Sequence, residues 1–79
     1  MIDKNDFKLA VGDRIRQARE DCKMTQTDLG KAIGLTGNNA MAKIYQMEKG
    51  MAGIDFYRIC LIAKATGKSL YFFADSLID

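Results

Sequence analysis

The sequence predicts an all-α protein. Apolar residues recur at spacings of three and four along most of the 79 residues, which is the period of a helix with one buried face. Residues that cap helices precede these stretches and glycines follow them. No stretch shows sustained alternation of apolar and polar residues, so strands are not expected. We therefore expect one domain over residues 1–79, built as a compact bundle of five short helices.

The first two helices follow from residues 5–34. Steps of four, four, three and four predict a first helix, capped by Asn5 or Asp6, whose inward face carries Phe7, Val11, Ile15, Ala18 and Cys22. Thr25 and Asp28 read as a capping box for a short second helix, with Asp28 in place of the usual Glu. Gly34 is well placed to end that helix in the left-handed conformation.

Three further helices are expected after the turn residues 35–39. The third has Ala40, Ile44 and Met47 on one side and ends at Gly50. The fourth is capped by Asp55, closed by Gly67, and has an inward face of Phe56, Ile59, Cys60 and Ala63. The fifth is capped by Ser69 and carries Leu70, Phe73 and Leu77.

The composition argues against an enzyme. The chain has no histidine, which is the commonest general acid or base and the commonest metal ligand. Cys22 and Cys60 cannot form a zinc site alone, and we expect two buried thiols in a reduced, cytoplasmic protein. No paired-carboxylate arrangement or glycine-rich phosphate loop is visible, so no metal and no cofactor are expected. The apolar runs are too short to cross a membrane.

A short capped helix, a glycine turn and a second helix form a helix-turn-helix pattern, whose second helix can enter a major groove. The chain also resembles the Xre-type family of phage Cro and repressor proteins over roughly residues 12–74. The resemblance rests on RIRQAR at 14–19, MTQ at 24–26, AIG at 32–34, MEKG at 47–50, IAKA at 62–65 and GKSL at 67–70. It implies a five-helix lambda-repressor-like fold, binding to double-stranded DNA and usually a two-fold dimer.

The chain departs from the family pattern between Gly34 and Gly50, where its 15 residues exceed the usual number by about four. Four residues are close to one helical turn. The extra residues near 35–41 form either a longer turn, with the third helix starting near Asn39, or an extra helical turn capped by Thr36. We favour the longer turn, because Gly37 is a poor residue for a helix interior.

The polar side of the third helix supplies the residues expected to read DNA. Amides bond adenine, lysine bonds guanine and small apolar groups meet the thymine methyl, so the candidates are Asn38, Asn39, Ala42, Lys43 and Gln46. A second group is expected to bind phosphates: Thr25, Gln26, Tyr45, Lys49 and Arg58. The resemblance places a phosphate-binding glutamine at Gln26, and it pairs Glu48 with Arg19 in a partly buried, structural ion pair.

Charge is unevenly distributed along the chain. Residues 23–68 hold seven basic and three acidic groups, a net charge of +4, whereas residues 1–22 are neutral and residues 69–79 carry −2. The positive excess coincides with the segment expected to meet DNA.

The end of the chain has more apolar surface than one helix face can bury. Leu61, Tyr71, Phe72 and Ile78 are surplus to the expected core and form a candidate interface for a homodimer. The sequence thus predicts a cytoplasmic, bacterial or phage-encoded regulator of transcription. We expect it to be a repressor that binds an inverted-repeat operator as a homodimer, with no small-molecule effector. The alternative is an antitoxin or an interaction module whose main partner is another protein.

Overall fold

The computed structural model describes residues 2–77, and within them every regular element is helical. The helices are α1 (Lys4–Asp21), α2 (Gln26–Ala32), α3 (Asn38–Glu48), α4 (Phe56–Thr66) and α5 (Leu70–Ala74), followed by a single 3-10 turn, η1 (Asp75–Leu77). The predicted all-α fold of five helices is confirmed.

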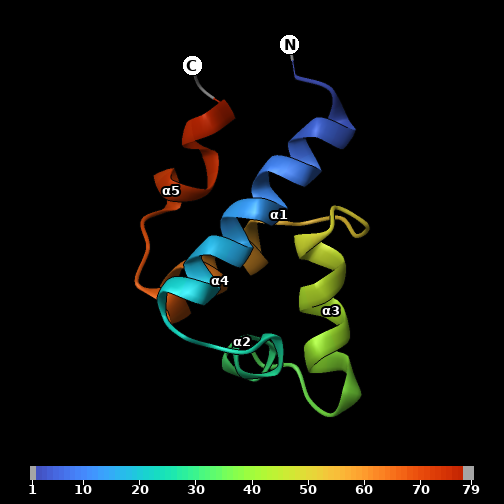
Figure 1. Ribbon diagram of the computed structural model, residues 1–79, viewed down its shortest axis with the longest axis vertical. Helices are drawn as coiled ribbons and strands as arrows, with labels where there is room; N and C mark the ends of the chain where they lie inside the picture. Colours follow the sequence, from blue (N-terminus) through green and yellow to red (C-terminus); the bar gives the residue numbers. More distant parts are fainter. Residues whose placement is uncertain (1, 78–79) are drawn as a thin grey trace.

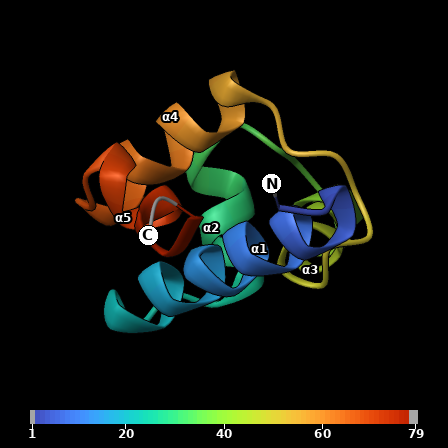
Figure 2. The same ribbon diagram turned by 90° about the horizontal axis from the view of Figure 1, so that it is seen from above.

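The helices pack around α1, which crosses the molecule obliquely (Figure 1). α3 stands along one side of the molecule and α5 lies on the opposite side, and the view from above shows the same separation (Figure 2). α2 packs against α3 and α4, and α1 packs against α3, α4 and α5. α3, the helix that follows the turn, is therefore held by α1 and α2 while its outer side faces solvent.

Local signals set most helix ends as predicted. Thr25 and Asp28 form the reciprocal capping box of α2, with the Thr25 Oγ accepting from Asp28 N and the Asp28 carboxylate accepting from Thr25 N, both at 3.0 Å. Asp55 caps α4 and Ser69 caps α5 through their side-chain oxygens. Gly67 ends α4 in the left-handed conformation, at φ +71°.

The start of α1 differs from the prediction. Asp3, not Asn5 or Asp6, is the cap, because its carboxylate accepts from Asn5 N at 2.7 Å. Two residues at the ends of α1 that were predicted to face inward are exposed. Phe7 borders an open apolar groove, and the Cys22 thiol donates to Thr66 O at 3.2 Å. Cys60 is only half-buried.

The extra residues before α3 form a longer turn, as predicted. Gly37 precedes the helix at φ +59° and ψ −144°, a conformation that side chains rarely adopt, and α3 starts at Asn38. Thr36 caps nothing here, since the cap position belongs to Gly37. The turn therefore lengthens the connection between α2 and α3 and leaves α3 with 11 residues.

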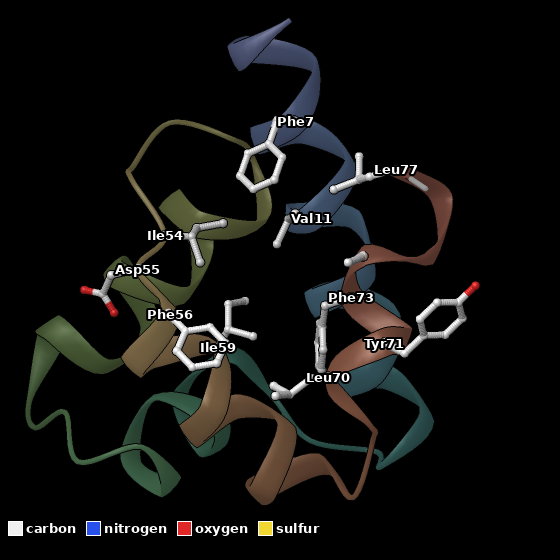
Figure 3. Close-up of a pocket in the computed structure, with 11 residues that line it drawn as sticks. Phe7, Val11, Ile54, Asp55, Phe56, Ile59, Leu70, Tyr71, Phe73 and Leu77 are labelled. Atoms are coloured by element: carbon white, nitrogen blue, oxygen red, sulfur yellow. The ribbon is translucent and has the colours of Figure 1, made fainter. Parts of the chain in front are cut away.

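The core joins one face from each helix. It is formed by Val11, Ile15, Ala18, Leu29, Ile33, Ile44, Met47, Ile62, Ala63 and Phe73. Phe56 and Leu70, also predicted to face inward, do not belong to it, since Phe56 is 71% exposed and Leu70 is 44% exposed. Both lie in the first turn of a helix and border the same open apolar groove (Figure 3).

Candidate nucleic-acid interface

Two glycines let the backbone of α3 come unusually close to its neighbours. A Cβ on Gly30 of α2 would overlap the backbone of Ala40, and a Cβ on Gly12 of α1 would overlap the carbonyl oxygens of Met47 and Glu48. Gly30 thus holds the first half of α3 and Gly12 holds its end. With a rise of 1.5 Å per residue, these two contacts lie about 10 Å apart along the helix.

A buried polar cluster ties the same three helices together. The Glu48 carboxylate of α3 accepts from Arg19 Nε at 2.7 Å and Nη2 at 3.2 Å, which is a two-pronged ion pair with α1. It also accepts from Gln26 Nε2 of α2 at 3.1 Å. Arg19 Nη1 donates to Met24 O, just before α2, at 3.0 Å. The Glu48 side chain is 3% exposed, so this cluster fixes the rotation of α3 from inside.

The buried face of α3 defines the face that it offers to solvent. Ala40, Ile44, Met47 and Glu48 are buried. On the other side, among the residues predicted to contact bases, Asn38, Asn39 and Ala42 are exposed, whereas Lys43 and Gln46 are half-buried at one edge. The structure therefore brings all five onto the outer part of α3, with Ala42 nearest its centre.

The residues predicted to bind phosphate fall into two groups. Tyr45 and Lys49 lie at the end of α3 on its exposed side, and the Lys49 ammonium lies 5.9 Å from the centre of the Tyr45 ring. Thr25 and Gln26 lie at the start of α2, where the Gln26 amide already donates one hydrogen bond to Glu48. Arg58 is half-buried in the first turn of α4, whose backbone N–H groups carry partial positive charge.

A polar cleft separates the exposed side of α3 from α1. It is lined by Asp13, Arg16, Arg19, Tyr45 and Lys49, among others. Hydrogen bonds from Arg16 and Gln17 hold the pKa of Asp13 below its usual value. These contacts keep the carboxylate charged and pair it with Arg16, which also pairs with Glu20, so the cleft presents the Lys49 ammonium beside the end of α3.

Of the four residues predicted to form a dimer interface, three lie within the described part of the chain. Tyr71 is 61% exposed, but Leu61 is half-buried against the core and Ile78 lies outside the described residues. Phe72 is half-buried between two cations, since Arg14 and Lys68 lie 5.0 and 4.9 Å from its ring centre. Arg14 pairs with Asp75 and Lys68 pairs with Asp21, so the Phe72 ring packs among charged side chains of its own chain.

Sequence reasoning missed three residues at this interface. Gly12 and Gly30 read as ordinary helix residues, because a close approach between helices leaves no local pattern. No role was predicted for Met41, which is 53% exposed next to Ala42. A helical wheel centred on Ala40, Ile44 and Met47 places it at the margin of the outer side of α3.

Other kinds of site find no support in the described part of the chain. Residues 2–77 hold no group of three or more His, Cys, Asp or Glu side chains arranged for a metal ion. No helix in this range is both long enough and apolar enough to pass through a membrane.

Two comparisons with known proteins agree with this geometry. A family model described as helix-turn-helix matches residues 15–73. A protein of Sinorhizobium fredii (strain NBRC 101917 / NGR234), described as the uncharacterized HTH-type transcriptional regulator y4wC, is 43% identical over 68 residues. That alignment covers 85% of this chain and 45% of the relative, so the chain spans less than half the length of this relative.

Proposed function

The chain belongs to the helix-turn-helix family of DNA-binding transcriptional regulators, and from this premise we propose that it is a repressor that binds an inverted-repeat operator as a homodimer. α3 is then the recognition helix in the major groove, and α2 crosses the backbone. Regulation by operator occupancy needs no catalysis and no cofactor. Such a regulator acts in the cytoplasm, where the DNA is.

The observation that carries the proposal is how the contacts of α3 with α1 and α2 fix its position and rotation. Gly12 and Gly30 fix its distance from α1 and α2, and Glu48 fixes its rotation, while its outer side carries amides and an alanine that can meet base edges. A helix held on its inner side and polar on its outer side is suited to reading a groove. Lys49 and Arg58 lie on either side of the connection to α4, where they can bind phosphates.

Selection of bound duplexes from a random pool tests the proposal directly. We expect an inverted repeat whose half-sites are centred about 34 Å, or one helical turn, apart. Binding should weaken steeply with salt, because each neutralised phosphate releases counterions and contributes about −0.9 to the slope of log K against log salt. A flat salt dependence, or no shift of any duplex at low salt, would refute DNA binding and favour a protein partner.

Gln46→Ala separates base reading from backbone contact. We expect it to reduce binding to the selected operator by about 1–3 kcal/mol while leaving binding to random duplex nearly unchanged. Gln17→Ala is the matched control, because Gln17 is a half-buried glutamine on α1 that bonds only Asp13 among the described contacts. Equal losses on operator and random duplex would assign Gln46 to the backbone instead.

Lys49→Ala should behave differently from Gln46→Ala. Removal of one phosphate contact weakens binding to all sequences alike and lowers the magnitude of the salt slope by about 1. A change in the preferred sequence with an unaltered slope would place Lys49 among the base contacts.

A further inference from the structure

The outer side of α3 has two edges of different chemistry. One edge is polar and consists of Asn39, Lys43 and Gln46. The other edge carries Met41 and Tyr45, which are 53% and 44% exposed and lie one helical turn apart on the same side of the helix. Amides and an ammonium group can form hydrogen bonds with bases, but an exposed methionine in the same interface can recognise only an apolar group.

Met41 lies in the half of α3 that a recognition helix directs at the bases. α3 starts at Asn38, so Met41 closes its first turn, and the N-terminal residues of a recognition helix are those that contact base edges. Tyr45 and Lys49 follow about 6 and 12 Å further along the axis. The Lys49 ammonium lies 5.9 Å from the centre of the Tyr45 ring, and a cation suits the phosphate backbone. Met41 is therefore the member of this edge that reaches the bases.

The Met41 side chain is available for a partner outside the chain. Among the described residues, the core and the side chains packed against it do not include Met41. Its neighbour Ala42 is exposed as well, so the two form one small apolar surface between polar residues. A methionine side chain is unbranched and polarizable, and it adapts to irregular apolar shapes. In the major groove the apolar group that a base edge presents is the C5-methyl of thymine.

We propose that Met41 is a specificity-determining residue that packs on the C5-methyl of a thymine in each operator half-site, beside Ala42. This inference rests on the proposed function, because α3 must enter the major groove. An A·T pair presents the adenine N7 and N6 toward one strand and the thymine methyl toward the other. The polar and apolar edges lie on opposite sides of Ala42 in the same way. The thymine that Met41 contacts therefore lies on one strand, and the amides of Asn39 and Gln46 face the other.

Replacement of thymine by uracil in the selected operator tests this proposal on the unchanged protein. Uracil keeps the hydrogen-bonding groups of thymine and lacks only the C5-methyl. We expect uracil at one or two positions of each half-site, on one strand, to weaken binding by about fourfold each, which is the effect of one buried methyl group. Uracil at the other operator positions, and uracil in random duplex, should leave binding unchanged.

Met41→Ala identifies which of these thymines Met41 contacts. We expect this variant to bind the thymine operator about fourfold or more weakly, and we expect uracil at one position to cause no further loss, because the two changes remove the same contact. Met51→Ala is the matched control, since Met51 is 67% exposed and lies in the connection between α3 and α4. It should keep the full effect of uracil at every position. Circular dichroism verifies that both variants stay folded.

The outcomes separate this inference from the proposed function. Uracil effects in Met41→Ala that equal those in wild type at every position would overturn the role of Met41. So would equal losses of Met41→Ala on operator and random duplex. Sequence-specific binding that tolerates uracil at all positions would refute the thymine contact and leave the proposed function in place. A chain that shifts no duplex at low salt would refute both.

Discussion

Removal of Arg19 should destabilise the whole domain, because it leaves the Glu48 carboxylate buried without its counter-charge. Arg19→Met keeps most of the apolar stem and deletes the guanidinium. Three hydrogen bonds are lost, two to Glu48 and one to Met24 O, and Gln26 alone remains to solvate a carboxylate that is 3% exposed. Breaking a buried pair in this way costs about 3–5 kcal/mol of unfolding free energy.

A loss of this size is large for a domain of 79 residues, whose total stability is expected to be about 5–10 kcal/mol. At about 4–8 °C per kcal/mol, the midpoint of thermal unfolding should fall by about 15 °C or more. Urea unfolding of wild type, Arg19→Met, Glu48→Gln and the double variant gives the coupling between the two side chains. The double variant should be more stable than the sum of the single losses predicts, since it leaves no buried charge unpaired.

Arg16→Met is the control for this experiment. Arg16 also lies on α1 and pairs with two carboxylates, Asp13 and Glu20, but its side chain is 44% exposed. Exposed pairs contribute about 0–1 kcal/mol, so this variant should unfold almost as wild type does. If Arg19→Met and Arg16→Met lost the same small amount, the cluster at Glu48 would not be what holds α3 in place.

Three further outcomes follow from the structure. Gly30→Ala should cost about 1–3 kcal/mol of unfolding free energy, because its Cβ would overlap the backbone of Ala40, whereas Gly53→Ala, which meets no atom within 4 Å, should be nearly neutral in the same urea titration. The hydrogen bonds from Thr25 hold the pKa of Asp28 below its usual value, so this carboxylate stabilises the fold above the unfolded value near 3.8 and loses that contribution as pH falls through the lower, folded pKa. Acid unfolding followed by circular dichroism should therefore show a smaller loss of stability between those two pH values in Asp28→Asn than in wild type. The same pH dependence in both proteins would contradict this assignment. Phe72→Leu should lower stability by about 1 kcal/mol without changing the dissociation constant of the dimer, since Phe72 is occupied by Arg14 and Lys68, and a weakened dimer in sedimentation would return Phe72 to the interface.

Features decided by neighbouring residues were predictable from the sequence. The capping box at Thr25, the caps at Asp55 and Ser69 and the left-handed Gly67 depend on interactions within a few residues, and all of them formed. The longer turn before α3 was predictable for the same reason, because glycine at position 37 disfavours a helix interior whatever surrounds it.

Features decided by distant parts of the chain were not predictable in the same way. Periodicity placed Phe56 and Leu70 on apolar faces, but it cannot say whether another helix covers those faces, and here none of the described helices does. Gly12 and Gly30 carry no local sign of a close helix contact, since their role depends on where the α3 backbone lies. The five residues predicted to contact bases all lie on the outer part of α3, but periodicity alone did not show that Lys43 and Gln46 are half-buried at its edge.

The sequence preference of such a helix depends on groups that touch no DNA. Gly30 and Gly12 contact α3 at points about two turns apart, and Glu48 prevents it from rotating between them. A displacement at either glycine would tilt the helix and move Asn39 and Gln46 together, whereas a change at one outer residue alters one base contact. We therefore expect Gly30→Ala, where it still folds, to reduce operator binding across several base positions at once. The selection from the random pool, repeated with this variant, measures the base preference at each position. A loss of preference at one position alone would show that the outer residues act independently of the contacts that hold α3 in place.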